Sequence, residues 1–378
     1  MEEKNLVKNG TKRETNMDLL RIVGMLMVIT IHCLSYNLVY NPQINIFNSL
    51  IIKFLDILVI PANAIFILLS AYYSIDKKFN LKRILNLWGK TIFYSLLIFL
   101  LFKIFGLKTN DFQSLFPVIS GQYWFIDAYL IMSFLSPILN IIMNKLNKKQ
   151  NTFLVIFGIV TLGVIRVLVN PTGILMGAML PFIFLYIIGA YIKKYVEIRP
   201  KELYMTKYIL IAVIITLLSI IIYSVAKRIN NDVIIYLLTI IFNGIEEYNS
   251  LLGVLMSVYI FMRFRTITIK SKTFTKIISF IVPSIFSVYL IHENVNLKKV
   301  LWANLGIMNF ANSWFMVPYI LLMIISVFIT CVIIDLIKRG IYYLVKKIPF
   351  VYKCINILNT RIEKINLKIN NYLAEETT

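Results

Sequence analysis

Long apolar runs follow one another along almost the whole chain, and short polar segments, often basic, separate them. The runs are continuous rather than alternating, and most are near the ~20 residues that a helix needs to cross a bilayer. A backbone in lipid must satisfy its own hydrogen bonds, so continuous runs of this kind form helices. The pattern therefore predicts an all-α fold, a polytopic membrane helix bundle.

The spacing of the apolar runs predicts about ten transmembrane helices. Their expected bounds are 18–38, 47–75, 84–106, 121–143, 152–170, 174–193, 207–226, 249–265, 277–295 and 313–337. The second run is long enough to be tilted or broken, and Pro61 is the expected break because proline lacks a backbone N–H. Residues 233–243 are apolar but short, which favours a re-entrant or interfacial segment over a span.

The distribution of basic residues supports this count. The chain has 39 Lys and Arg residues and a formal net charge of +21. In a soluble protein this charge is typical of nucleic-acid binding, but membrane proteins concentrate Lys and Arg in their cytoplasmic loops. With ten spans and the N-terminus inside, the outer loops hold only Lys108, Lys227, Arg228, Lys298 and Lys299. We therefore expect both termini in the cytoplasm and no nucleic-acid partner.

Composition agrees with a membrane protein and divides the chain into three parts. The chain is 59% hydrophobic and 15% charged, whereas soluble domains have about 45–50% apolar and about 25% charged residues. Residues 1–16 are predicted to be a cytoplasmic N-terminal segment, and residues 17–340 the transmembrane domain. Residues 341–378 form a basic cytoplasmic tail whose apolar positions suit a helix on the inner membrane surface.

Two ionisable side chains, Arg21 and His32, interrupt the first apolar run. Eleven residues correspond to about three helical turns, so both lie on one face, roughly 16 Å apart. Asp18 lies one turn before Arg21 and is placed to pair with it. Charges at membrane depth normally face a partner or a water-filled cavity. The alternatives are a snorkelling anchor for Arg21 and an interhelical hydrogen bond for His32.

Six segments, in order, resemble the acyltransferase 3 family of integral-membrane O-acyltransferases. The first is Asp18-Leu-Leu-Arg21 followed by His32, which resembles the family's motif of Arg, ten residues and His. The others are PANAIFILLSAYYSI (61–75), FNLKRIL (79–85), YWFIDAYLIMSFLSPIL (123–139), YNSLLGVLMSVYIF (248–261) and SIFSVYLIHENV (284–295). Together they extend the resemblance over residues 17–337.

The chain departs from the family's pattern at two places. Ala71 stands where the family usually has glycine. Trp124 and Asp127 stand where many members have a longer Trp–Glu spacing. These departures leave the subfamily and the acceptor open.

Four basic residues are predicted on the inner side of the membrane: Arg21, Lys82, Arg83 and Lys90. A cluster of cations at the cytoplasmic opening of a helix bundle can bind phosphates by charge-assisted hydrogen bonds. The resemblance implies that the phosphates belong to acyl-CoA, with acetyl-CoA as the expected donor and no metal. The alternative is that Lys82 and Arg83 only help to fix the orientation of the chain in the membrane, as basic residues of cytoplasmic loops do.

The span count places a second set of polar and aromatic groups in the outer half of the membrane: His32, Trp124, Asp127, Tyr289, His292 and Glu293. We expect His32 to act as a general base or to carry the acyl group briefly, and Arg21 to orient the donor. Glu293 or Asp127 is expected to hold its second ring nitrogen. The aromatic residues suit sugar faces, although an interfacial aromatic belt explains them equally well. His292 is alternatively an interface histidine.

The first functional hypothesis is an O-acyltransferase of the bacterial cytoplasmic membrane. It would move an acyl group, acetyl in the expected case, from acyl-CoA to a hydroxyl of a cell-envelope or exported saccharide. The expected partners are membrane lipids and a saccharide acceptor. The alternative is a transporter or flippase of saccharides or lipid-linked intermediates, although the chain shows no internal repeat of the kind many transporters carry. The third hypothesis is a polysaccharide polymerase, but that activity does not explain why Arg21 and His32 occur together in the first apolar run.

Overall fold

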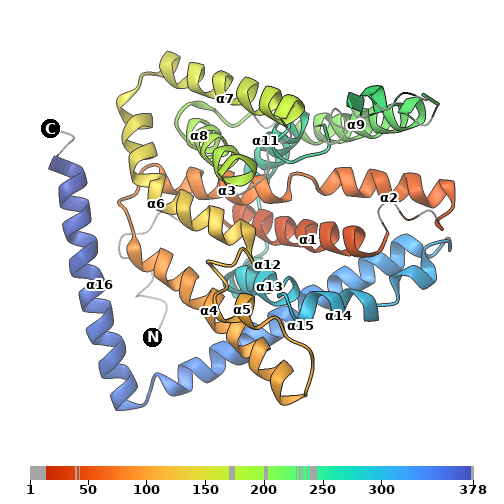
Figure 1. Cartoon of the computed structure of the whole chain (residues 1–378). Coiled ribbons are helices and arrows are strands. Elements are labelled where there is room, and N and C mark those ends of the chain that lie inside the picture. The colour runs from red at the N-terminus through yellow and green to blue at the C-terminus, as the bar shows by residue number, and fades with distance from the viewer. Residues whose placement is uncertain are drawn as a thin grey trace.

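The computed structural model describes residues 14–38, 41, 43–169, 175–199, 203–226, 228–229, 231, 233–235, 237–238 and 245–375, with the backbone alone for 162–169, 175–176, 226 and 375. Within these ranges every regular element is a helix (Figure 1). The α-helices of the first half are α1 (Thr15–Asn37), α2 (Ile46–Val59), α3 (Ala62–Ser74), α4 (Leu81–Ile104), α5 (Asp111–Leu115), α6 (Trp124–Lys145), α7 (Lys148–Val169) and α8 (Leu180–Tyr195). Those of the second half are α9 (Tyr204–Ala226), α11 (Leu251–Arg265), α12 (Lys272–Ile281), α13 (Ile285–His292), α14 (Leu297–Asn304), α15 (Met316–Val345) and α16 (Pro349–Glu375). Three short elements are η1 (Leu175–Met179), η2 (Val282–Ser284) and η3 (Ile307–Phe310).

Within the described ranges, eight helical segments are long and apolar enough to cross a membrane. They are Thr15–Asn37, Ile46–Ser74, Leu81–Ile104, Trp124–Lys145, Gly177–Tyr195, Tyr204–Val225, Lys272–His292 and Met316–Val345. Each coincides with one of the ten expected spans. The all-α, polytopic membrane fold is thereby confirmed.

The other two expected spans correspond to α7 and α11. The last side chains of α7 lie outside the described residues, and α11 has 15 residues. A helix of that length covers about 22 Å, less than the ~30 Å hydrocarbon core. The count of ten and the cytoplasmic placement of both termini therefore stay predictions. Most of the segment 233–243, expected to be re-entrant or interfacial, lies outside the described residues.

Two prolines break long apolar segments. Pro61 separates α2 from α3, as predicted, because its ring nitrogen has no hydrogen to continue the helical ladder. Pro283 lies in η2 and separates α12 from α13 in the same way. The second break was not expected. It leaves α13 as a short helix with a nearly all-buried surface that ends at His292.

One end of the bundle gathers basic residues, and we call it the basic end. There Asn16 of α1 donates a hydrogen bond to the carbonyl of Phe264 in α11, 2.9 Å away. Asn140 of α6 and Arg83 of α4 both contact Ser74, the last residue of α3. The basic residues at this end include Lys77, Lys78, Lys82, Arg83, Lys193, Lys194, Arg263 and Arg265.

The C-terminal helix α16 runs across the basic end rather than parallel to the bundle helices (Figure 1). The Asn370 side chain accepts a hydrogen bond from the N–H of Phe79 and donates one to its carbonyl, each 3.0 Å long. Asn366 accepts a hydrogen bond from the N–H of Leu81. The tail is thus a helix fixed to the start of α4, and its contact with the membrane surface stays a prediction.

Helices α3 and α8 approach each other closely because small residues face each other. A Cβ on Gly189 would lie 2.7 Å from the carbonyl oxygen of Leu68 and 2.8 Å from the Cβ of Ala71. Small residues at such crossings let backbones pack tightly in membranes. Ala71, which stands where the resembling family has glycine, is accommodated because its neighbour across the interface is itself a glycine.

A buried carboxylate connects α13 to two long helices. Asp335 of α15 accepts hydrogen bonds from Tyr94 of α4 (2.6 Å) and Ser287 of α13 (2.7 Å). The Asp335 side chain is almost completely buried. Buried charges require such partners, so this cluster helps to fix the position of α13, the helix that carries His292.

Candidate active site

A basic pocket of about 620 Å³ lies between α3, α4 and α6 at the basic end. Five cationic side chains line it: Lys77, Lys78, Lys82, Arg83 and Lys90. The rest of its lining includes hydroxyl and amide side chains of α3 and α6, among them Ser70, Ser133 and Asn140. Its cations and its size, which is within the usual range for small-molecule sites, suit a phosphorylated ligand.

Arg83 is the cation most firmly fixed in the basic pocket. Its guanidinium donates hydrogen bonds to the hydroxyl of Tyr129 (2.9 Å) and to Oγ of Ser74 (3.3 Å). The Tyr129 hydroxyl in turn lies 3.0 Å from that of Ser70. Lys90 lies about two turns further along α4 than Arg83, with its amino group 3.4 Å from the carbonyl of Pro283.

Arg21 lies apart from the pocket lining. It forms the predicted ion pair with Asp18, at 2.6 Å, and its guanidinium carbon lies 5.1 Å from the ring centre of Tyr73. The pairing with Asp18 is confirmed. The structure places Arg21 at the basic end beside the last turn of α3, so it does not join Lys82, Arg83 and Lys90 in one cluster.

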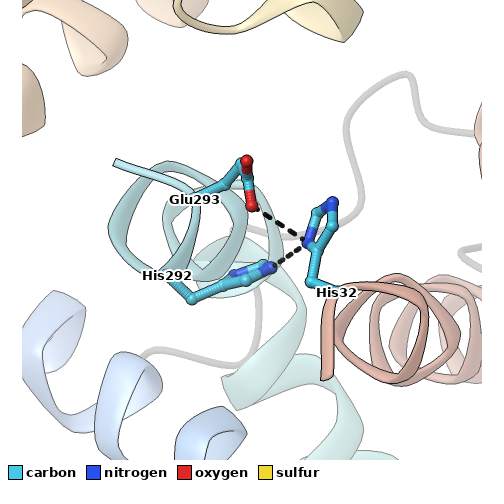
Figure 2. A group of neighbouring side chains, drawn as sticks. All are labelled: His32, His292 and Glu293. Atoms are coloured by element: carbon cyan, nitrogen blue, oxygen red, sulfur yellow. Dashed lines mark hydrogen bonds and ion pairs between the residues drawn. The ribbon is translucent and has the colours of Figure 1, made fainter. Parts of the chain in front are cut away.

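The two histidines of the chain meet deeper in the bundle, beside Glu293 (Figure 2). Nδ1 of His32 in α1 lies 3.0 Å from Nε2 of His292 at the end of α13. The same nitrogen of His32 lies 3.3 Å from Oε2 of Glu293. The sequence placed these three residues in one layer of the membrane, and the structure brings them into contact.

The hydrogen bonds assign the tautomer of each ring. Nδ1 of His292 lies 2.6 Å from the carbonyl of Val288, which can only accept, so the neutral ring carries its hydrogen on Nδ1. Nε2 of His292 is then an acceptor, and Nδ1 of His32 must be its donor. The hydrogen of neutral His32 therefore lies on Nδ1, and its Nε2 carries a free lone pair. Within the described residues, Nε2 of His32 has no hydrogen-bond partner.

Glu293 is held by two further groups. Lys298 of α14 donates a hydrogen bond of 2.6 Å to its Oε1, and the Tyr36 hydroxyl donates one of 3.2 Å to the same oxygen. Burial lowers the pKa of the Lys298 ammonium, but the hydrogen bonds and charge interactions with Glu293 and Tyr36 together outweigh burial, so the pKa is raised above its ordinary value. This arrangement fixes one oxygen of Glu293 and directs the second oxygen toward His32.

The same three side chains could in principle ligate a metal ion. One ligand atom from each of His32, His292 and Glu293 lies within 4.8 Å of the others. However, the Lys298 ammonium already neutralises Glu293 at 2.6 Å. Nε2 of His292 is also engaged with His32. The donor set therefore fits a hydrogen-bonded histidine pair better than a cation site.

A column of aromatic side chains connects the histidine pair to the basic pocket. The ring of Tyr289 lies 6.5 Å from His32 and 6.1 Å from Phe125. Phe125 stacks on Tyr129 at 6.0 Å, and the Tyr129 hydroxyl contacts Arg83. The column is a continuous series of ring contacts between the basic pocket and the histidine pair.

Two predicted outer residues do not reach His32. Trp124 packs against Phe125, Phe182 and Tyr248 and is partly exposed. Asp127 lines a separate groove between α4 and α6. Of the two carboxylates proposed to support His32, the structure selects Glu293.

Several residues of the site were not identified from the sequence. Lys298 was assigned only to an outer loop, and Tyr36 and Tyr129 resemble ordinary membrane aromatics in the sequence. Lys77 and Lys78 were counted only among the basic residues of a cytoplasmic loop. The sequence held no helical signal for Lys298, because it follows Glu293 by five residues across the turn between α13 and α14.

Comparison with known proteins gives one match. No curated protein and no solved structure matches the chain. The sequence profile of the acyltransferase 3 family, described as an acyltransferase domain, matches residues 14–352, nearly the whole chain. The matched range contains the basic pocket, the aromatic column and the histidine pair, and the chain belongs to this family of acyltransferases.

Proposed function

We propose that this protein transfers an acyl group, acetyl in the simplest case, from cytosolic acyl-CoA to a hydroxyl of a cell-envelope or exported saccharide. The bacterial cytoplasmic membrane is its proposed location. Family membership supports acyl transfer over the transporter alternative. The observation that carries the mechanism is the orientation of His32, whose Nδ1 faces His292 and Glu293 and whose Nε2 is free.

The basic pocket is the proposed donor site. Its five cations suit the phosphates of coenzyme A, and Arg83 can bind a phosphate with two parallel hydrogen bonds. The pantetheine arm would then extend along Phe125 and Tyr289 toward His32. This assignment puts the basic end of the bundle in the cytoplasm, in agreement with the distribution of Lys and Arg.

His32 is the proposed general base. Its Nε2 takes the proton of the acceptor hydroxyl while the oxygen attacks the thioester carbonyl carbon. When the tetrahedral intermediate collapses, the C–S bond breaks and the proton passes from Nε2 to the leaving thiolate. Glu293, 3.3 Å from Nδ1, stabilises the imidazolium formed in between. Attack by Nε2 itself, with a transient acyl-imidazole, uses the same free lone pair.

The direct test is transfer of label from radioactive acetyl-CoA to envelope saccharides in membranes that contain the protein. His32→Ala is expected to lower the rate by roughly 10²–10⁴-fold, the usual contribution of a general base. Binding of acetyl-CoA by the same variant should be unchanged. Full transfer activity in His32→Ala would exclude this mechanism.

A second variant tests the donor site. Arg83→Met is expected to raise the KM for acetyl-CoA with a smaller effect on kcat, because a charge-assisted contact to phosphate is lost. Lys103→Met is the matched control, since Lys103 is an exposed cation of the same helix that pairs with Asp111 outside the pocket. An equal rise in KM for both variants would show that the pocket does not bind the donor.

A further inference from the structure

A second cavity lies on the outer surface of the bundle, between α4 and α6. It is a groove of about 720 Å³, formed by both helices and by the segment that leads into α6. Its apolar lining includes Trp88, Leu130, Ile131 and Phe134. Trp88, Ile131 and Phe134 are exposed at the protein surface, and both helices belong to the membrane-crossing set. The groove therefore opens toward the hydrocarbon of the bilayer.

One part of the groove carries two polar atoms without a partner. Oδ1 of Asp127 and Oγ of Ser120 are both buried and form no hydrogen bond within the described residues. Both residues line the groove, and the Asp127 residue is only 6% exposed. A buried acceptor without a donor is costly, so their presence together points to a ligand that supplies hydrogen-bond donors.

The two features of the groove define the chemistry of that ligand. The apolar walls along α6, from Leu130 to Phe134, match a hydrocarbon chain. Asp127, three residues before Leu130, requires a hydroxyl or a similar donor at one end of that chain. A volume of 720 Å³ is in the range of sites for small molecules. These properties together describe an amphiphile.

The polar part of the groove lies on the same turn of α6 as one ring of the aromatic column. In that column, the ring of Tyr289 lies 6.5 Å from that of His32. Phe125, two residues before Asp127, contacts Tyr289 at 6.1 Å. A headgroup held at Asp127 would thus lie on the lipid-facing side of α6, across the helix from Phe125 of the aromatic column.

We infer that the groove between α4 and α6 binds a membrane amphiphile, with its hydrocarbon chain against Leu130, Ile131 and Phe134 and a headgroup hydroxyl donating to Asp127. This inference rests on the proposed function, because it identifies the amphiphile as the acyl acceptor. The acceptor then enters from the bilayer, whereas the donor enters the basic pocket between α3, α4 and α6.

The test is photolabelling of the full chain in nanodiscs. The probe is a monoglucosyl diacylglycerol that carries a diazirine in one acyl chain, and its counterpart has every sugar hydroxyl methylated. We expect the free-hydroxyl probe to label α6 between Leu130 and Phe134, and the methylated probe to label it much less. Equal labelling by both probes would mean ordinary bilayer contact and would overturn the inference.

Three variants, one of them a control, test the assignment of the groove residues. Asp127→Leu removes the acceptor and is expected to weaken labelling by roughly tenfold or more, while thermal stability stays the same or rises because an unsatisfied buried carboxylate is lost. Ile131→Trp fills the groove and should abolish labelling. Ile138→Trp is its control, because Ile138 is exposed on the same helix outside the groove. Undiminished labelling of Asp127→Leu would contradict the role of Asp127.

The readout separates this inference from the proposed function. Labelling measures binding and needs no acyl transfer. If His32→Ala abolishes transfer while both probes label α6 equally, the transferase proposal stands and the groove proposal fails. If the hydroxyl-dependent labelling is seen but acetyl transfer is absent, the groove is an amphiphile site and the transferase proposal fails.

Discussion

Nδ1 of His32 lies 3.0 Å from Nε2 of His292, although 260 residues separate them in the chain. Because His292 uses its other nitrogen to bind the carbonyl of Val288, only His32 has a ring nitrogen left for chemistry. The two histidines therefore have different roles. His292 is a positioning residue that orients its neighbour, and His32 is the candidate base.

Glu293→Gln is expected to reduce kcat by roughly 10–100-fold, because the amide cannot stabilise the imidazolium of His32 by charge. The KM for acetyl-CoA should stay the same, since Glu293 lies outside the basic pocket. Initial rates of acetyl transfer at varied donor concentration measure both. Glu197→Gln, an exposed change near the basic end, is the matched control. A rise in KM without a fall in kcat would place Glu293 in donor binding instead.

The raised pKa of Lys298 predicts a dependence of stability on pH. Its ammonium is stabilised in the folded protein by Glu293. A raised folded pKa adds stability that is fully present below the ordinary lysine value of about 10.4 and is lost as pH rises through the folded value. Lys298→Met should therefore have a lower Tm than the wild type at pH 7, with the difference shrinking above pH ~10.4.

Tryptophan fluorescence during heating in nanodiscs measures these Tm values. Lys299→Met serves as the control, since Lys299 neighbours Lys298 and is exposed. A difference in Tm between wild type and Lys298→Met that stays constant from pH 7 to pH 11 would mean that the ion pair with Glu293 does not stabilise the fold.

The sequence predicted the helices well because their cause is local. Each apolar run must form a helix in lipid, and Pro61 breaks its run wherever the rest of the chain lies. The pairing of Asp18 with Arg21 was equally predictable, since it depends only on helical spacing. The shared depth of His32, His292 and Glu293 followed from counting spans.

Other features depend on how helices that are far apart in the sequence are rotated relative to one another. No single apolar run determines that rotation. The sequence could not decide between Glu293 and Asp127 as the partner of His32, because depth alone is the same for both. It also missed Lys298, whose role requires the turn after α13 to bring it back to Glu293. The place of α16 depends on contacts between Asn370 and Phe79, 291 residues apart.

The close approach of α3 and α8 predicts a strong effect at Gly189. Gly189→Ala places a methyl group 2.7 Å from the Leu68 carbonyl oxygen and 2.8 Å from the Cβ of Ala71. Such overpacking costs about 1–3 kcal/mol, so the Tm in nanodiscs should fall. Adding Ala71→Gly should restore part of the loss, because it removes one of the two clashes.

Gly340→Ala is the control for Gly189→Ala, since a Cβ at Gly340 meets no atom within 4 Å. Its Tm should match the wild type or exceed it, as alanine favours a helix over glycine. An unchanged Tm for Gly189→Ala would show that the helices separate at little cost.

Helix α16 is expected to support donor binding through the backbone of the basic pocket. Asn366 and Asn370 together make three hydrogen bonds to Phe79 and Leu81, in the segment that also carries Lys77, Lys78 and Lys82. Replacing both asparagines by alanine releases this segment. The KM for acetyl-CoA should rise roughly three- to tenfold, because each lost hydrogen bond contributes about 0.5–1.5 kcal/mol.

The value of kcat should change little in the Asn366 and Asn370 double variant, because the histidine pair and Glu293 lie far from α16. Asn371→Ala tests the specificity of the effect, since Asn371 is exposed on the same helix next to Asn370. Titration of the protein with acetyl-CoA in nanodiscs gives the binding constant without turnover. If the double variant binds acetyl-CoA as tightly as Asn371→Ala does, the tail does not organise the donor pocket, and its helix serves another purpose at the basic end.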